Sequence, residues 1–180
     1  MNKLYIVIAF LLTILAAYLK QWVDGSALIN ITLQIFVYGI PSAIICYTYQ
    51  YRLTMKGCLC IALFFATLFV LLGINFPYEY LRANYLFILT VLVVAPLCEE
   101  LFFRGFVYKF ITDELGKSPK YSILFSAMIF SIFHINPISM LAAFVSGIGL
   151  AYILYKFKSL SLCIMAHSGY NLAIFLMINY

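Results

Sequence analysis

Charged residues are scarce in this chain. They make up 9% of its 180 residues, and only six of them are acidic. An ordinary soluble domain carries about 25% charged residues, so this composition excludes that class. Hydrophobic residues instead fill 66% of the chain, and the mean hydropathy is +1.07. The net charge of +5 does not indicate nucleic acid, because the basic residues stand at the ends of apolar runs. The sequence therefore predicts an integral protein of the lipid bilayer with no nucleic-acid partner.

A disulfide framework and a long polar linker are lacking as well. The five cysteines are an odd number, and each lies within or beside an apolar segment. The longest polar link, 113–120, is a short loop in which Gly116 fits a helix C-cap. The apolar run after Met1-Asn2-Lys3 resembles the start of a signal peptide, yet the many later runs favour a retained first helix.

The apolar runs predict an all-α fold, a polytopic bundle of about seven transmembrane helices. One crossing needs about 20 apolar residues, and most of the runs have that length. The run 121–155 is too long for one crossing and contains the turn signal Asn136-Pro137, so we divide it into two helices. The predicted helices are 4–22, 27–50, 57–76, 84–111, 121–135, 138–155 and 160–178. The sixth carries small residues at four-residue spacing, which favour close helix contact, at Ser139, Ala143, Gly147 and Ala151.

The lysines and arginines between the predicted helices indicate how the bundle is oriented. Positive residues prefer cytoplasmic loops. A cytoplasmic N-terminus would put eight of these residues inside, namely Lys3, Arg52, Lys56, Lys109, Lys117, Lys120, Lys156 and Lys158. Only Lys20 and Arg82 would then lie outside. We therefore predict a cytoplasmic N-terminus and a C-terminus on the opposite side.

Three charges stand close together inside the fourth predicted helix, at Glu99, Glu100 and Arg104. A charge at membrane depth costs about 2.5–3.5 kcal/mol on insertion scales, so pairing or a function is expected. Glu100 and Arg104 are four residues apart on one helix face and can pair directly. Glu99 points about 100° away from Glu100 and is left outside that pair, which suits it to taking a proton from water. The alternative is that both glutamates only hold helices together through the arginine.

Both histidines of the chain also lie inside apolar runs. His134 stands near the end of the fifth predicted helix, and His167 shares one face of the last helix with Asn171. By helical rise from the nearest lysines, Glu99 and the two histidines lie about 14–21 Å deep, in the middle of the bilayer. Ionisable residues at that depth usually face a functional cavity. Pro96, one turn before Glu99, predicts an opening in the helix that admits water.

The polar residues of the last four helices resemble the signature of a known family, the CPBP intramembrane proteases. The motifs are Glu99-Glu100-x-x-x-Arg104, Phe130-x-x-x-His134 and His167-x-x-x-Asn171, within about residues 84–178. The family comprises type II CAAX prenyl endopeptidases and bacterial abortive-infection and bacteriocin-immunity proteins. The resemblance divides the chain into three N-terminal helices of unassigned role (1–83) and a four-helix catalytic core (84–180), within one membrane domain.

The resemblance implies an endopeptidase in which Glu99 activates a water molecule. His134 would position that water or share its proton, and His167 and Asn171 would hydrogen-bond the oxyanion of the tetrahedral intermediate. A supporting role, holding these side chains in place, would fall to Glu100 and Arg104. The implied substrate is a peptide or protein, either a C-terminal tail or a bacteriocin-type peptide, and the implied location is a bacterial cell membrane.

A metal cofactor and two other functions stay open at this point. Zn²⁺ could be held by Glu99, His134 and His167 with one position left for water, although we favour attack by water without a metal. A non-catalytic immunity or peptide-binding protein could use the same fold. A small proton-coupled transporter is less favoured, because the chain shows no internal repeat.

Overall fold

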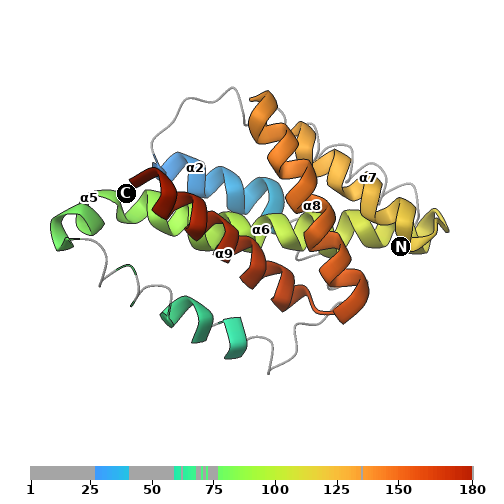
Figure 1. Ribbon diagram of the computed structural model, residues 1–180, viewed down its shortest axis with the longest axis horizontal. Helices are drawn as coiled ribbons and strands as arrows, with labels where there is room; N and C mark the ends of the chain where they lie inside the picture. The colour runs from blue at the N-terminus through green and yellow to red at the C-terminus, as the bar shows by residue number, and fades with distance from the viewer. Residues whose placement is uncertain are drawn as a thin grey trace.

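The computed structural model describes residues 27–40, 59–61, 63–67, 70, 72, 77–134 and 136–179. All regular structure in these ranges is helical, in agreement with the predicted all-α fold (Figure 1). The elements are α2 (Ala27–Gln34), η1 (Ile35–Gly39), α5 (Tyr78–Leu89), η2 (Thr90–Val94), α6 (Ala95–Glu100), η3 (Leu101–Val107), η4 (Phe110–Glu114), α7 (Pro119–Ile132), α8 (Pro137–Phe157) and α9 (Leu160–Asn179), where η denotes a π-helix. The predicted helix 4–22 lies outside the described residues, as do parts of 27–50 and 57–76, so the count of seven stays a prediction.

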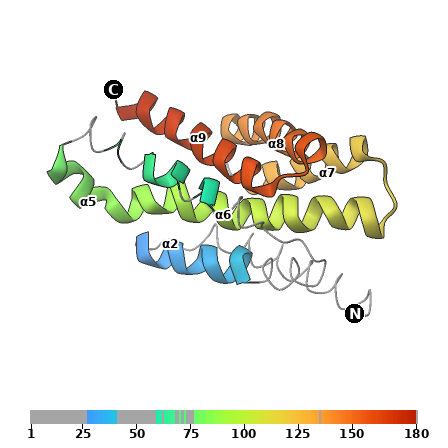
Figure 2. The ribbon, with the colours of Figure 1, turned by 90° about the horizontal axis from the view of Figure 1, so that it is seen from below.

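The segments α5 to η4 form one long helical run through the centre of the molecule. Seen from below, α2 lies on one side of this run, while α7, α8 and α9 lie on the other (Figure 2). Within the described part of the chain, three helices are long and apolar enough to cross a membrane: Asn84–Glu114, Pro137–Phe157 and Leu160–Ile178. These helices identify an integral membrane protein. The 14-residue α7 is apolar too, but it spans only about 21 Å.

The hairpin predicted at Asn136-Pro137 is present, and a side-chain cap explains where α8 begins. The Asn136 side chain accepts hydrogen bonds from the backbone N–H groups of Ile138 at 2.8 Å and Ser139 at 3.4 Å, and so caps α8. The preceding helix ends at Ile132 rather than at residue 135. His134 therefore lies just beyond α7, whereas the sequence placed it within the helix.

The central helix is not opened at Pro96, which corrects the sequence expectation. The backbone stays helical from α5 to η4, and Pro96 is buried. The chain accommodates the proline by a change of register: the N–H of Ala95 bonds the carbonyl of Thr90, five residues earlier, at the end of η2. A second π-segment, η3, follows Glu100 directly. The two glutamates thus stand on a short α-helical segment between two π-segments, which are frequent at functional sites.

The small-residue seam of α8 is buried at three of its four positions, and it approaches α7 closely at Gly147. Ala143, Gly147 and Ala151 are buried, whereas Ser139 is exposed at the hairpin end. A Cβ on Gly147 would lie 3.2 Å from the Cβ of Ala127, so only glycine allows this approach without displacing α7. The close contact brings the backbone of α8 within reach of the polar residues on the central helix.

An aromatic cluster joins the N-terminal part of the chain to this core. Tyr38, on η1, packs its ring 5.5 Å from Phe102, 6.0 Å from Phe103 and 6.3 Å from Phe133, measured between ring centroids. Tyr38 and the first two phenylalanines are buried. The rings fill the space on the α2 side of the helix that carries the glutamates.

Candidate active site

Glu100 is the centre of a buried polar cluster. Its Oε1 accepts a hydrogen bond from Nη1 of Arg104 at 2.9 Å, which confirms the pairing expected from the four-residue spacing. The same oxygen lies 2.8 Å from Nδ1 of His167 on α9. Because a carboxylate oxygen accepts, we assign the hydrogen to Nδ1. Glu100 and Arg104 are fully buried, so this cluster is a charged hydrogen-bond network shielded from solvent.

Arg104 also ties the central helix to α8. Its Nη2 donates to the backbone carbonyl of Gly147 at 3.2 Å. Its guanidinium carbon lies 4.6 Å from the ring centroid of Phe130 on α7, a cation–π contact. Arg104 therefore contacts α7 and α8 directly, and it is linked to α9 through Glu100 and His167. Removing it would leave a buried carboxylate and a backbone carbonyl without this donor.

Glu99 lies on the other side of His167. Its Oε2 is 4.0 Å from Nε2 of that ring, and its side chain is 19% exposed, in contrast to the fully buried Glu100. The imidazole thus stands between two carboxylates, with one ring nitrogen facing each. Of the two carboxylates, only that of Glu99 is partly exposed.

His134 contributes a second imidazole from the end of α7. Its Nδ1 lies 3.2 Å from the carbonyl of Phe130, which accepts the hydrogen bond, so Nδ1 is assigned the hydrogen and Nε2 is left as the acceptor. The ring of Phe130 meets both histidines edge-on, at centroid distances of 5.1 Å for His134 and 5.8 Å for His167. The ring of Phe130 therefore contacts both imidazoles as well as the guanidinium group of Arg104.

A cavity of about 190 Å³ opens between α7, α8 and α9 beside these residues. It is lined by Phe130, His134, Ser139, Ala142, Ala143, Ser146, His167, Tyr170, Asn171 and Ile174. The structure brings three of the four residues predicted as catalytic to one cavity wall, and the fourth, Glu99, approaches the ring of His167. Residues from three predicted motifs therefore converge, although they lie far apart in the sequence.

Two side chains of α9 form hydrogen bonds with backbone carbonyls of the central helix to which Pro96 cannot donate. Proline has no N–H, so Pro96 donates neither to Leu92, four residues earlier, nor to Val91, five residues earlier. The hydroxyl of Ser168 donates to the carbonyl of Leu92, and Nδ2 of Asn171 donates to the carbonyl of Val91 at 2.9 Å. Pro96 thus leaves two backbone carbonyls as acceptors for side chains of α9. The two bonds fix His167 against the helix that carries Glu99.

Ser168→Ala is expected to lower the free energy of unfolding by about 1–3 kcal/mol, the cost of a buried acceptor that loses its donor. In a Pro96→Ala background the cost should be smaller, because the backbone N–H gained at position 96 can reach one of the carbonyls. Thermal unfolding of the purified variants in detergent measures both values. Ser161→Ala, which removes a buried hydroxyl from the same helix, is the matched control. Equal costs in the two backgrounds would refute the coupling to Pro96.

The zinc hypothesis requires three ligands in one place. Among the described residues, no group of three or more His, Cys, Asp or Glu side chains is arranged to hold a metal ion. His167 faces Glu99 at 4.0 Å through Nε2, the nitrogen that the bond between Nδ1 and Glu100 leaves as an acceptor. Glu99, His134 and His167 are therefore not assembled as a zinc site in this arrangement.

Three contributors were not found by reasoning from the sequence. The bond between His167 and Glu100, the support from Ser168 and the carbonyl of Gly147 all join residues that are remote in the chain. Two local signals did exist. A proline inside an apolar helix predicts unused carbonyls, and a serine next to the motif histidine offers a donor for one of them.

The site defines a class: a membrane-helix protein with paired carboxylates and histidines around an internal cavity. Comparison with protein families identifies the family to which the chain belongs. The family model for type II CAAX prenyl endopeptidase Rce1-like proteins matches residues 81–173, more than half of the chain, so the chain belongs to this protease family. The match confirms the resemblance to CPBP proteases, and it spans every motif residue. No curated protein and no solved structure matches the chain.

Proposed function

We propose that this protein is an intramembrane endopeptidase in which Glu99 activates the attacking water. The observation that carries the proposal is the position of His167, held by the buried Glu100 at Nδ1 and facing the accessible Glu99 across 4.0 Å at Nε2. A structural ion pair would need only Glu100 and Arg104. Hydrolysis of a peptide bond needs more than this ion pair: a second carboxylate to act as the base, and a cavity that can hold the substrate.

In the proposed reaction Glu99 takes a proton from water while the water oxygen attacks the carbonyl carbon of the peptide bond. The carbonyl oxygen becomes an oxyanion, which accepts hydrogen bonds from His167 and Asn171. The proton held by Glu99 then passes to the leaving nitrogen as the carbon–nitrogen bond breaks. To donate from Nε2 the ring of His167 must carry a second proton, and the two flanking carboxylates neutralise that charge.

His134 is proposed to position the water through Nε2, the nitrogen that the bond to Phe130 leaves as an acceptor. Asn171 keeps one amide hydrogen for the oxyanion while the other is bound to Val91. Glu100 and Arg104 hold the reacting groups in place without contact with the substrate. No step in this scheme uses a metal.

The proposed substrate is a peptide or protein segment with apolar side chains, since Ala142, Ala143 and Ile174 are among the residues that line the cavity. The family description names prenylated CAAX tails. A bacteriocin-type peptide is the other substrate that we propose, with a bacterial cell membrane as the location. Both place the scissile bond close to a lipid bilayer.

Asn171→Ala is expected to reduce the rate constant of cleavage by about 10²–10³, the usual effect of losing one oxyanion donor. Ser168→Ala is the matched control, because it removes the neighbouring bond to the central helix but no proposed oxyanion donor. Product formation by purified protein in liposomes measures both rates. An Asn171→Ala variant that cleaves as fast as the wild type would contradict the oxyanion role.

The same assay tests the metal. Full activity is expected after treatment with a strong chelator and removal of bound metal, and added Zn²⁺ should not increase it. Loss of activity that zinc restores, together with near-stoichiometric zinc in the purified protein, would refute the metal-independent mechanism.

A further inference from the structure

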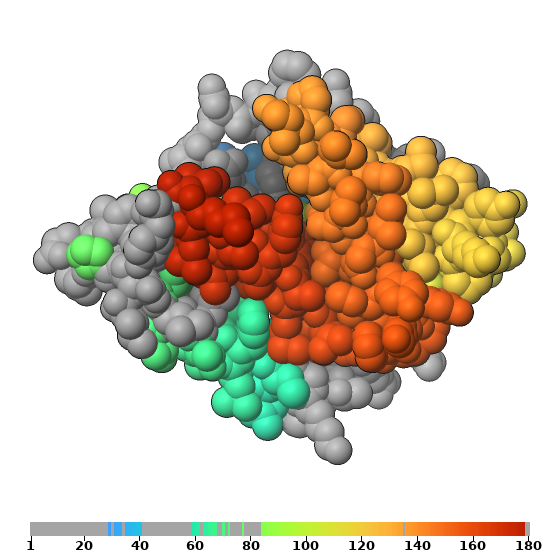
Figure 3. Space-filling model, in the orientation of Figure 1, coloured from blue at the N-terminus to red at the C-terminus, as the bar shows by residue number. Residues whose placement is uncertain are grey.

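A crevice of about 530 Å³ lies at the end of the bundle opposite the α7–α8 hairpin. The described residues that line it come from the start of α7 and the end of α8: Ser118, Pro119, Lys120, Ile123, Tyr152 and Tyr155. These two segments lie side by side at the right of the space-filling view (Figure 3). None of the six residues lines the cavity of the candidate active site, so the crevice is a separate feature of the fold.

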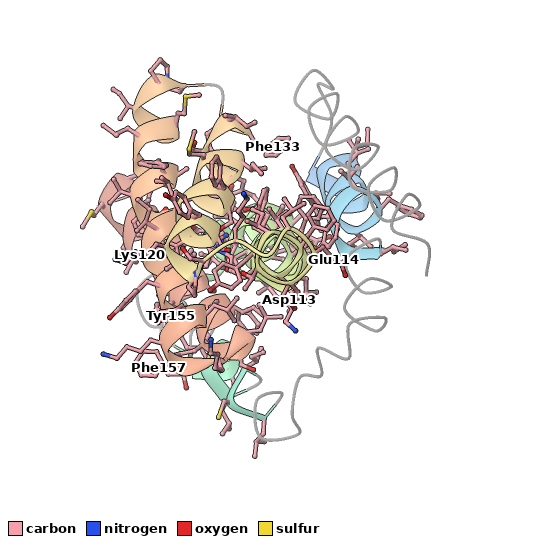
Figure 4. The ribbon with its side chains drawn as sticks, turned by 90° about the vertical axis from the view of Figure 1, so that its right-hand side faces the viewer. Asp113, Glu114, Lys120, Phe133, Tyr155 and Phe157 are labelled. Carbon is pink, nitrogen blue, oxygen red and sulfur yellow. The ribbon has the colours of Figure 1, made fainter. Side chains whose placement is uncertain are left out.

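This end of the bundle is charged, and the mouth of the crevice is positive. Lys120 lines the crevice and is exposed. Nζ of Lys158 lies 4.9 Å from the ring centroid of Tyr155, which holds a second ammonium group beside the lining. Figure 4 looks onto this end: Lys120 and Tyr155 lie on its left, whereas Glu114 lies on the right, on the central helix. Because no acidic side chain is among the described residues that line the crevice, an anion bound there would meet cations alone.

Hydroxyl groups add neutral hydrogen-bond donors to the same lining. Tyr152 and Tyr155 are both exposed and contribute two phenol groups. Ser118 stands at the N-cap position of α7, but its side chain makes no capping hydrogen bond there. Phosphate oxygens accept hydrogen bonds from hydroxyl groups as well as from lysine ammonium groups. The combination of two ammonium groups with several hydroxyls therefore fits the phosphate group of an anion.

The lining becomes apolar with depth into the membrane. Ile123 lies about 4.5 Å deeper along α7 than Lys120, since each helical residue rises about 1.5 Å. Beyond it the exposed side chains of Leu124 and Met128 continue an apolar surface along the same helix. Tyrosines such as Tyr155 are typical of the membrane–water interface, where lipid headgroups lie. The crevice thus passes from a cationic mouth at headgroup level to an apolar part at the level of the acyl chains.

We propose that this crevice binds one phospholipid with an anionic headgroup. The phosphate lies between the ammonium groups of Lys120 and Lys158, and the acyl chains run over Ile123 into the bilayer. Basic pockets between membrane helices are known to bind anionic headgroups in this way. A soluble phosphate would leave the apolar part of the crevice unfilled, and a zwitterionic lipid would bring a positive charge of its own towards the lysines. Binding here requires no protease activity, so its test is independent of the proposed function.

Native mass spectrometry of the full chain, released from detergent micelles, counts bound phospholipid and measures its dissociation constant. One lysine near an anionic lipid contributes about 1 kcal/mol, which corresponds to about fivefold in affinity. With two lysines at the mouth, one molecule of phosphatidylglycerol should bind about 25-fold more tightly than phosphatidylcholine with the same acyl chains. Equal affinities for the two lipids would overturn the proposal.

Substitution of the lysines tests where the lipid binds. Lys120→Gln and Lys158→Gln should each weaken the binding of phosphatidylglycerol about fivefold. Lys117→Gln is the matched control: it removes the same charge from an exposed position three residues before Lys120, but Lys117 does not line the crevice. Its affinity should equal that of the wild type. An equal loss in all three variants would show a diffuse attraction by the charged end and would overturn the site. All three lysines are exposed, so thermal unfolding without lipid should be unchanged.

Glycerol phosphate distinguishes a lipid from a soluble anion as the ligand. It carries the phosphate group without acyl chains, so it should bind much more weakly than phosphatidylglycerol, because it buries no apolar surface against Ile123. The same mass spectrometry measures its dissociation constant. If glycerol phosphate binds as tightly as the phospholipid, and Lys120→Gln weakens both equally, the crevice is a site for a soluble phosphate and the lipid proposal is refuted.

Discussion

Replacing Glu99 by glutamine is expected to abolish peptide hydrolysis and to leave substrate binding intact. The amide keeps the shape of the side chain but cannot take a proton from water. A positioned general base contributes about 10²–10⁴ to the rate, and since water is a poor nucleophile without it, we expect the loss at the upper end of this range. A base acts only in the chemical step, so the rate constant should fall while the binding constant for the peptide is unchanged.

The measurement combines single-turnover cleavage with binding of a labelled peptide to protein in liposomes. Glu114→Gln is the matched control, because it neutralises a carboxylate on the same helix at the charged end, away from the cavity. Its cleavage rate should equal that of the wild type. A Glu99→Gln variant that retains a rate within about tenfold of the wild type would remove Glu99 from the role of base.

Arg104→Ala is expected to destabilise the protein by about 3–5 kcal/mol, the cost of breaking a buried ion pair by removing one partner. Arg104 and Glu100 are fully buried. In the described structure Nε of the arginine and Oε2 of the glutamate already have no hydrogen-bond partner. The variant would therefore leave Glu100 with His167 alone and would remove the donor to Gly147.

Abundance in the membrane and thermal unfolding in detergent measure this loss. Lys109→Ala is the matched control: Lys109 and Asp113 form a pair with the same spacing on the same helix, but their side chains are 29% and 44% exposed. A surface pair contributes about 0–1 kcal/mol, so this variant should behave like the wild type. Arg104→Ala protein with normal stability and no cleavage would instead assign the arginine a direct part in the reaction.

The two predictions separate the adjacent glutamates by role. Glu99 is accessible and approaches the cavity through His167, whereas Glu100 is buried and holds that ring from the other side. Their neighbouring positions on a helix turn the two side chains by about 100°, which lets Glu100 be fully buried while Glu99 is partly exposed. In the proposed mechanism one short sequence therefore supplies both the supporting and the reactive carboxylate.

The sequence by itself determined the features that depend on composition and local spacing. Long apolar runs identified a helical membrane protein, and α8 and α9 begin within one residue of their predicted starts. The four-residue spacing of Glu100 and Arg104 predicted their ion pair, and Asn136-Pro137 predicted the hairpin. These succeed because a helix fixes the relation between residues three or four positions apart.

Only the tertiary structure decided how the motifs work together. Arg104 bonds Gly147 across 43 positions, His167 bonds Glu100 across 67, and Ser168 and Asn171 bond Leu92 and Val91 across 76 and 80. Such contacts follow from how the helices pack, which no local spacing encodes. The same packing satisfies the carbonyls that Pro96 leaves without a backbone donor, because Ser168 and Asn171 of α9 donate to them. The sequence shows which carbonyls lose their partner, but only the packing of a distant helix shows what replaces it.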